Sequence, residues 1–508
     1  MGNDWSGLDT PPLGGWRPEL TVSVVIPAYG SQQHLDLTLA ALSRQTYPAE
    51  LLEVIVVDDG SPNPLRLPQL RPSRTRIVRA EGPGWGPGHA VARGVRDAAG
   101  EIIHRLDADM VLFPDHVEAL ARWHHLVPYA VSLGMKRFAD VAASTVTAAQ
   151  VADDAAGLFT TDGTEPHDYI EDMFRRTRDL RDAGSAAFLA HVGATVAVRR
   201  ELYERAGGYD PDLHLGEDTE FGYRLAQAGA LFIPDRQARA WHVGPTAMTK
   251  RGERLRRFNR PFLATRMPEP RWLRKNGGTS WAVPLVTATV DVDGQPLELV
   301  RACVDGLLTG DIQVVLSGPW NRLADERRDV LDDPDLDLRL IRETYRADQR
   351  VRFVVEPPRT AFPAPFLLRV PAYARLAADT VPMLIAEAER HEAAVVLAGA
   401  VELRRTAADS RAAWSGASLE HRKVSPAAAG ITDLRQLADA ALAELLVDAQ
   451  LSAPERWTPM VVEVGGVRTL LRAAAMVAKL TAIRAARQFG RRNQDRSSAG
   501  RVHHPSGR

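Results

Sequence analysis

The sequence predicts an α/β fold with a mostly parallel, Rossmann-like sheet and flanking helices, a second α/β domain and a basic C-terminal helix. Short β-branched runs alternate with amphipathic helical segments from residue 21 onward, which is typical of parallel strands joined by helices. The same alternation restarts near residue 281, beyond a segment that contains proline, glycine and charged residues. A chain of 508 residues with 45% hydrophobic and 25% charged residues is long enough to form two or three cores.

The first elements follow one another in a regular order. Residues 21–30 form a β-branched run that ends in proline and glycine, and a helix with its leucines on one face follows over residues 32–45. A second apolar strand covers residues 54–57, and a second helix covers residues 89–100. The sequence therefore predicts two consecutive strand and helix units before the strand that begins near residue 102.

Pairs of aspartates follow two of these strands. Asp58 and Asp59 end the second strand, and Asp107 and Asp109 follow the third. Because ligands bind beyond the carboxyl ends of the strands in such sheets, we expect these side chains to share one crevice. Carboxylates there can hold a hard cation through oxygen atoms, although on spacing alone turn-forming aspartates are the simpler interpretation.

Two later segments add candidate residues. Glu217 and Asp218 stand where an amphipathic helix begins, and His242 follows another strand. Taken singly, the acids could merely favour the helix dipole, and His242 could be an ordinary packed histidine.

Composition excludes several classes of protein. The formal net charge of −1 provides no field for a polyanion, so no nucleic-acid partner is expected. The single cysteine, Cys303, excludes a disulfide framework and favours a reducing compartment. The N-terminus lacks a signal-peptide profile, and no apolar run reaches the roughly 18 residues that a membrane span needs. We therefore expect a cytoplasmic protein, either soluble or peripheral at the inner face of the membrane.

Taken in order, six segments resemble the family 2 inverting glycosyltransferases with a GT-A fold. They fall within residues 20–245 and read VSVVIPAYG, VIVVDDGS, LDADM, GATVAVRRELYERAGGYDPDL, GEDTEFGYRL and a late Trp-His pair. The resemblance implies a GT-A catalytic domain. It does not include the Gln-x-x-Arg-Trp motif, which separates the chain from the processive polymer synthases.

The resemblance also implies roles for individual residues. Those implied to contact the nucleotide or donor are Pro27, Ala28, Tyr29, Asp59, Arg93 and Asp107. Of these, Arg93 stands near the place of an Arg-Asn pair that family members carry. Those implied to hold a divalent cation, Mn²⁺ or Mg²⁺, are Asp107, Asp109 and His242. The catalytic residues are implied to be Glu217 and Asp218, with Asp218 as general base.

The expected reaction is metal-dependent, inverting transfer of a sugar from a nucleotide-sugar, with a UDP-sugar as the expected donor. Inversion needs a base on the face opposite the leaving group, within reach of the acceptor hydroxyl. The expected acceptor is a carbohydrate or a lipid-linked precursor in envelope or glycoconjugate synthesis. Two other classes stay open: a nucleotidyltransferase, which would release pyrophosphate, and a catalytically silent nucleotide-binding scaffold.

The second half reads as a degenerate copy of the first. The predicted parts are a tail, the catalytic domain, a linker, the GT-A-like copy and a basic helix with its tail, over residues 1–20, 21–265, 266–280, 281–460 and 461–508. By sequence alignment, Leu316 and Ser317 replace the first pair of aspartates, and Ala398 and Ala400 replace the second. We therefore expect one metal site per chain. The copy is a candidate scaffold, dimer contact or acceptor platform, and the alternative is an unrelated α/β domain. The basic helix is a candidate contact with an anionic membrane surface.

Overall fold

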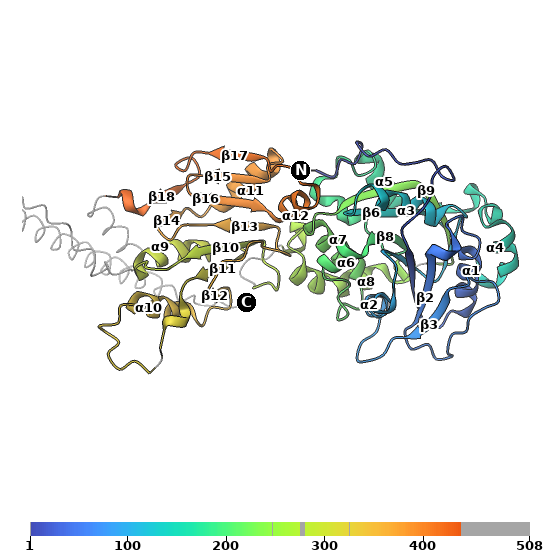
Figure 1. Ribbon diagram of the computed structural model, residues 1–508, viewed down its shortest axis with the longest axis horizontal. Coiled ribbons are helices and arrows are strands. Elements are labelled where there is room, and N and C mark those ends of the chain that lie inside the picture. The colour runs from blue at the N-terminus through green and yellow to red at the C-terminus, as the bar shows by residue number, and fades with distance from the viewer. Residues whose placement is uncertain (1, 246, 275–279, 325, 438–508) are drawn as a thin grey trace, which may run out of the picture. The chain divides into compact units, whose positions relative to one another are not determined.

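The computed structural model describes residues 2–245, 247–274, 280–324 and 326–437, and it confirms the predicted α/β fold class (Figure 1). Two large sheets, each with helices packed against it, account for most of these residues. The predicted basic helix over residues 461–508 lies outside the described residues. The domain boundaries given above stay a prediction.

The first sheet and its helices come from the N-terminal half of the chain. In chain order the elements are β1 (Val22–Ala28), α1 (Gln32–Leu42), β2 (Leu52–Asp58), β3 (Thr75–Arg79), α2 (Pro87–Asp97), β4 (Ile102–Leu106), β5 (Met110–Leu112), α3 (His116–Leu126), β6 (Ala130–Ala139), α4 (Ala148–Asp154), β7 (Glu165–Pro166), α5 (Asp168–Arg176), β8 (Thr195–Arg199), α6 (Arg200–Arg205), α7 (Glu217–Gln227), β9 (Leu231–Val243) and α8 (Ala247–Arg266).

The strand order is β3-β2-β1-β4-β8-β6-β9-β5, with β7 paired to β6. The first four strands are parallel, as the alternation of strands and helices predicts. Beyond β4 the sheet is mixed, because β8 runs antiparallel to both β4 and β6, and β5 antiparallel to β9. The prediction of a mostly parallel sheet therefore describes the half that carries the candidate site, but not the whole sheet.

Alternation along the central strands separates two cores. In β1, Val24 and Ile26 pack in the core that contains residues of α1, α3 and α4. Val25, together with Ile55 and Val57 of β2, packs in the core that contains residues of α2, α5 and α7. Each strand thus buries both faces, which explains its continuous apolar character. In β1 and β2 the polar side chains lie only near the strand ends.

The second sheet repeats the start of this topology. Its elements are β10 (Val286–Asp291), α9 (Leu297–Leu307), β11 (Ile312–Ser317), α10 (Leu336–Tyr345), β12 (Val351–Val354), β13 (Phe366–Arg369), α11 (Thr380–Arg390), β15 (Val395–Ala398), β16 (Val401–Arg405), α12 (Thr406–Ser415) and β17 (His421–Val424). The order β12-β11-β10-β13-β16 matches β3-β2-β1-β4-β8, again with four parallel strands and an antiparallel fifth. A separate pair joins β14 (Ala374–Leu376) to β18 (Ile431–Asp433).

Strand register corrects the alignment of the two halves. Ile102 pairs with Val22 in the first sheet, and Phe366 pairs with Val286 in the second, so β13 is the counterpart of β4. Counting five and seven residues onward from Ile102 and from Phe366, Pro371 and Tyr373 stand where the first half has Asp107 and Asp109. The sequence alignment to Ala398 and Ala400 was wrong because β15 is an equally apolar strand, but it pairs with β16 and β17 instead.

The other pair of aspartates shifts in the same way. Val57 pairs with Pro27, and Ser317 with Asp291, at equivalent places of the two sheets. The counterparts of Asp58 and Asp59 are therefore Gly318 and Pro319 rather than Leu316 and Ser317. The expectation that the second half lacks these carboxylates still holds at the corrected positions.

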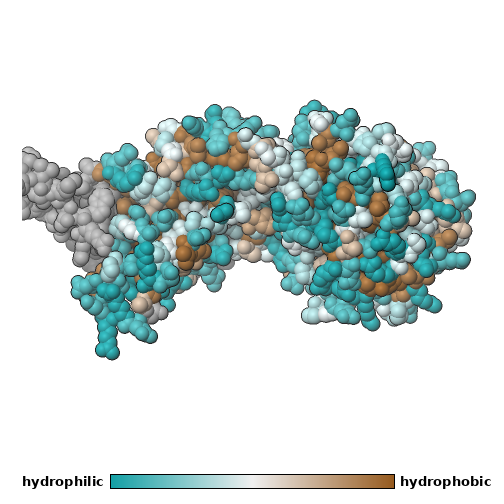
Figure 2. All heavy atoms as spheres, in the orientation of Figure 1, coloured by the Kyte–Doolittle hydropathy of each residue, from teal (hydrophilic) through white to brown (hydrophobic). Residues whose placement is uncertain are grey.

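On the face drawn in Figure 2, hydrophobic side chains form separate patches among hydrophilic ones. No helix within the described residues is long and apolar enough to cross a membrane.

Candidate active site

Strand ends that are far apart in sequence line one cavity. Pro27, Ala28, Asp59, Asp107 and Asp109 all contribute to its walls, and its volume is about 420 Å³. Tyr29 lies at the same cavity with 64% of its surface exposed, together with His34 and Pro87. The structure therefore brings together the aspartates that the sequence predicted to share a crevice.

The two aspartates that follow β2 have different surroundings. Asp58 is buried, and its carboxylate accepts hydrogen bonds from the backbone of Ser61 and Leu65 at 2.8 and 3.4 Å. Burial disfavours its charge, but these hydrogen bonds outweigh that effect and hold the pKa of Asp58 below its usual value. Asp59 faces the cavity, and its Oδ2 accepts the N–H of Gly86 at 2.7 Å. Asp58 thus shapes the loop, while Asp59 remains available to a ligand.

The aspartate pair between β4 and β5 also divides its contacts. Asp107 Oδ1 lies 3.2 Å from the guanidinium of Arg105. Asp109 Oδ2 lies 3.4 Å from Nε2 of His242, because Met110 and His242 pair directly between β5 and β9. Burial raises the pKa of Asp109, an effect that His242 opposes.

Unpartnered atoms beside Asp109 fit a cation. Asp109 Oδ1 and His242 Nδ1 are both buried without a hydrogen-bond partner, and such groups are rare unless a ligand satisfies them. Of the three predicted metal ligands, Asp109 and His242 are brought together, whereas Asp107 is held by Arg105. Among the described residues, no group of three or more histidine, cysteine or acidic side chains could enclose a metal ion. A cation here would need oxygen atoms from a bound diphosphate or from water.

Arg105 occupies the centre of the site, a role that the sequence analysis missed. It is buried, lines the cavity, and places Nη2 3.2 Å from both Asp107 and Glu217. The guanidinium lies directly over Gly193: a Cβ at that position would be 0.7 Å from Arg105 Nη1. Only glycine leaves room for this arrangement. A signal was available, since His104 and Arg105 are the two polar residues of a strand that is otherwise apolar.

The acidic pair at the start of α7 also has two different environments. Glu217 is buried, and burial together with the charge of Asp218 raises the pKa of Glu217 to about 8, despite the nearby Arg105. Asp218 accepts backbone hydrogen bonds from Gly193 at 3.2 Å and Thr219 at 2.7 Å. Glu217 is therefore tied to Arg105, whereas Asp218 is fixed by backbone donors.

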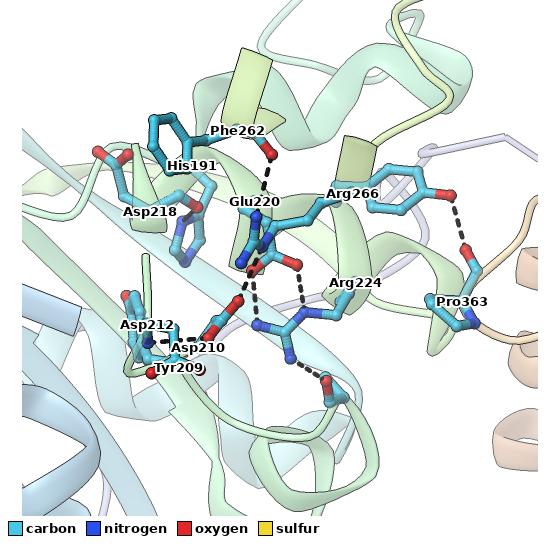
Figure 3. Close-up of polar contacts among 12 residues, drawn as sticks. His191, Tyr209, Asp210, Asp212, Asp218, Glu220, Arg224, Phe262, Arg266 and Pro363 are labelled. Carbon is cyan, nitrogen blue, oxygen red and sulfur yellow. Dashed lines mark hydrogen bonds and ion pairs between the residues drawn. The ribbon is translucent and has the colours of Figure 1, made fainter. Parts of the chain in front are cut away.

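His191 contacts the backbone of Asp218. Its Nδ1 donates a hydrogen bond to the backbone oxygen of Asp218 at 2.7 Å, and burial lowers the pKa of His191 to about 4. Figure 3 shows the Asp218 carboxylate turned away from the Glu220 and Arg224 ion pair further along the helix. His191 thus stays neutral at pH 7 and positions the start of the helix.

Two further basic residues show where prediction and structure differ. Arg93 forms an ion pair with Asp97 at 2.6 Å on α2 and is not among the residues that line the cavity. Arg93 lies six residues after Pro87, nearly two helical turns along α2, and is therefore further from the strand ends than Pro87. Lys136, which the sequence analysis did not consider, is partly buried on β6, and burial lowers its pKa to about 8 against the opposing charges of Asp107 and Asp218.

The corresponding place in the second domain contains an arginine. There β14 pairs with β18 as β5 pairs with β9, so Asp433 stands where His242 stands. Arg435 contacts Asp433 through Nε at 3.0 Å and Nη2 at 2.7 Å, and its guanidinium lies 3.3 Å from the ring centroid of Tyr373. A fixed positive charge is therefore located where the first domain has its candidate cation site.

The fold, with its strand-end carboxylates and an acid at a helix start, defines a GT-A type of domain. Residues 23–203 match the family model "Glycosyl transferase family 2". The N-terminal part of the chain is therefore a family 2 glycosyl transferase domain, as the resemblance implied.

Several named relatives share sequence with this chain. Chondroitin synthase of Escherichia coli is 26% identical over 394 residues, which cover 69% of this chain and 55% of the relative. Hyaluronan synthase of Pasteurella multocida is 25% identical over 372 residues, 68% of this chain and 36% of the relative. Validoxylamine A glucosyltransferase of Streptomyces hygroscopicus subsp. limoneus is 36% identical over 249 residues, 43% of this chain and 50% of the relative.

These matches have two consequences. The chain spans 55% or less of the length of each of these three relatives. Two of the three are named as a chondroitin or a hyaluronan synthase, so relatives of the chain include polysaccharide synthases, and the separation from processive polymer synthases stays a prediction. Among solved structures, a mannosyltransferase of Pyrobaculum calidifontis in complex with GDP-Man and Mn²⁺ is 22% identical, covering 53% of this chain and 68% of its own, with a TM-score of 0.35.

Proposed function

We propose that the chain is an inverting, metal-dependent glycosyltransferase that moves a sugar from a UDP-sugar to a hydroxyl group of a carbohydrate or lipid-linked acceptor. The observation that carries the proposal is the single cavity lined by Asp59, Asp107 and Asp109, with Asp109 beside His242. The match to family 2 and the named relatives, which include a glucosyltransferase, support the reaction class.

The donor half of the site is assigned to the strand ends. Asp59 offers Oδ1 to the nucleobase while Gly86 holds Oδ2, and Tyr29 supplies an exposed ring beside it. Asp107, oriented by Arg105, is placed to accept a hydrogen bond from a ribose hydroxyl. Arginine fixes a carboxylate well because its planar guanidinium offers several donors in one geometry.

The cation is assigned to Asp109 and His242, and the mixed oxygen and nitrogen donors favour Mn²⁺ over Mg²⁺. A divalent cation bound there would offset the charge that develops on the phosphates of the leaving nucleotide. The atoms assigned to the cation are Asp109 Oδ1, which is buried without a hydrogen-bond partner, and His242 Nε2, which lies 3.4 Å from Asp109 Oδ2.

Asp218 is assigned as the base that accepts the proton of the acceptor hydroxyl. Backbone donors from Gly193 and Thr219 hold its carboxylate in one orientation at the start of α7. The N-terminal end of that helix carries the positive end of the helix dipole, which stabilises a negative charge placed there. Glu217, with a pKa raised to about 8, is mainly protonated at pH 7 and is the poorer base of the two.

A substitution of the base tests this assignment. Asp218→Asn keeps the shape of the side chain and leaves the strand-end residues assigned to the donor unchanged, so UDP affinity should stay within about twofold. Sugar transfer should fall by about 10²- to 10⁴-fold, the usual contribution of a general base. Full transfer in the variant would remove Asp218 from the mechanism, and release of pyrophosphate instead of UDP would indicate a nucleotidyltransferase.

A further inference from the structure

A stacked pair of aromatic rings stands beside the cavity. The indole of Trp85 and the imidazole of His214 lie with their centroids 4.5 Å apart and their planes at 16°. His214 Nδ1 donates a hydrogen bond to the backbone oxygen of Trp85 at 2.9 Å. Trp85 nevertheless keeps 55% of its surface exposed, so one large apolar ring is fixed in orientation and yet open to a ligand.

Both rings are connected to the candidate active site. Trp85 precedes Gly86, which donates its N–H to Asp59 in the cavity, and Pro87 after it lines the same cavity. His214 belongs to the segment that leads into Glu217 and Asp218. The stack thus bridges a residue assigned to the donor and the segment that carries the assigned base.

The two segments approach so closely that only glycine fits between them. Gly86 has a φ of +105°, and a Cβ there would lie 2.9 Å from the backbone oxygen of His214. A residue other than glycine would be strained and would also separate the loops. The ring pair is therefore held by the backbone, which reduces the ordering that a ligand would otherwise require.

We propose that the Trp85 and His214 stack binds the acceptor sugar through the apolar C–H face of a pyranose ring. This inference rests on the proposed function and narrows it, because it requires the group that receives the sugar to be a carbohydrate. A flat ring offers contact area over which a pyranose can lie, while polar groups around it set orientation. The position before Asp218 favours the acceptor over the donor, because the base must reach the acceptor hydroxyl.

The test measures sugar binding by saturation-transfer NMR on the full chain, with UDP and Mn²⁺ present. The probes are the methyl β-glycosides of glucose, N-acetylglucosamine and glucuronic acid and the disaccharides cellobiose and chitobiose. We expect at least one probe to bind, with saturation greatest on the protons of one ring face. Trp85→Ala should weaken that binding by about tenfold or more, and Trp85→Phe should retain most of it.

Trp272 supplies the matched control. It is exposed to a similar degree, at 60%, and no ring contact involves it within the described residues. Trp272→Ala should leave the binding of every probe unchanged. An equal loss in both tryptophan variants would overturn the inference, since it would reflect a general effect of losing an exposed indole.

Titration of UDP and a UDP-sugar into the same variants separates this inference from the proposed function. We expect Trp85→Ala to bind both as the unmodified chain does. A parallel loss of UDP-sugar affinity would assign the stack to the donor and overturn the inference. Normal UDP binding with no Trp85-dependent sugar binding would overturn it while leaving the proposed function standing. Failure of the unmodified chain to bind UDP would instead contradict the proposed function.

Discussion

Gly193→Ala should disrupt the centre of the site without replacing a charged residue. The new Cβ would lie 0.7 Å from Arg105 Nη1, 1.9 Å from Cζ and 2.7 Å from Nη2, so the guanidinium must move away. Ordinary contact distances exceed 3.4 Å, and the displacement must therefore be on the order of 3 Å. The backbone of Gly193 is unaffected, and its N–H can still reach Asp218.

The cost follows from the contacts that Arg105 would lose. Its Nη2 donates a hydrogen bond to Glu217 and forms an ion pair with Asp107, both at 3.2 Å. A hydrogen bond with a charged partner contributes about 1.5–3 kcal/mol, and a partly exposed ion pair contributes up to about 1 kcal/mol. Glu217 is already mainly protonated at pH 7, since its pKa is raised to about 8, and Asp107 is partly exposed to water. Both effects reduce the loss, so we expect the free energy of unfolding to fall by about 2–4 kcal/mol.

Thermal unfolding of four chains would measure this effect: the unmodified chain, Gly193→Ala, Arg105→Ala and the double variant. The single glycine variant should lower the midpoint by roughly 5–12 °C for a domain of this size. In the Arg105→Ala background the same change should cost almost nothing, because the clash is gone. Gly7→Ala, where a Cβ would meet nothing within 4 Å, is the control. Equal losses in both backgrounds would refute the reasoning.

Two further predictions concern protons and metal stoichiometry. His116 and His124 are buried, and burial lowers their pKa values to about 4 and about 3. Because the folded pKa lies below the unfolded value of about 6.5, their stabilising contribution is complete above that pH and is lost as the pH falls below it. Between pH 7 and pH 5 the free energy of unfolding should fall by about 2 kcal/mol per histidine. Urea unfolding at both pH values should therefore show a fall that is about 2 kcal/mol smaller in His124→Leu than in the unmodified chain. The same pH dependence in both chains would contradict this prediction. Equilibrium dialysis with UDP should find one Mn²⁺ per chain, because Arg435 supplies the positive charge at Tyr373 in the second domain, and two tightly bound ions would show that this interpretation is wrong.

Much of the site could be predicted because it lies where apolar strands end. In parallel sheets ligands bind beyond the strand ends, so the pattern predicted that Asp59, Asp107 and Asp109 share one crevice, while their individual roles came from the family resemblance. Arg105 and Gly193 were not predicted, because their roles depend on each other across 88 positions of the chain and arise only when β4 pairs with β8. Lys136 likewise reaches the site through a strand irregularity between Gly134 and Met135 that no periodicity indicates.

The second domain shows a different limit of sequence patterns. Its repeat was recognisable, but β13 is only 4 residues long and is followed by Pro371, so the more apolar β15 was mistaken for the counterpart of β4. The pairing of β13 with β10 identifies β13 as the counterpart of β4, and such pairing cannot be predicted from composition. The corrected register also identifies Tyr373 and Asp433, with the neighbouring Arg435, as the residues at the place of the candidate cation site.

The most direct test of the central claim is calorimetric titration of UDP into the full chain, with and without Mn²⁺, for the unmodified protein and for Asp109→Ala. Asp109 stands beside His242 and has one unpartnered buried oxygen. Replacing Asp109 by alanine should therefore remove the main protein ligand proposed for the cation. We expect binding that requires Mn²⁺ and that falls at least about tenfold in the variant. Binding that is absent, or that responds neither to the metal nor to the substitution, would contradict the assignment of this cavity to a nucleotide-sugar donor.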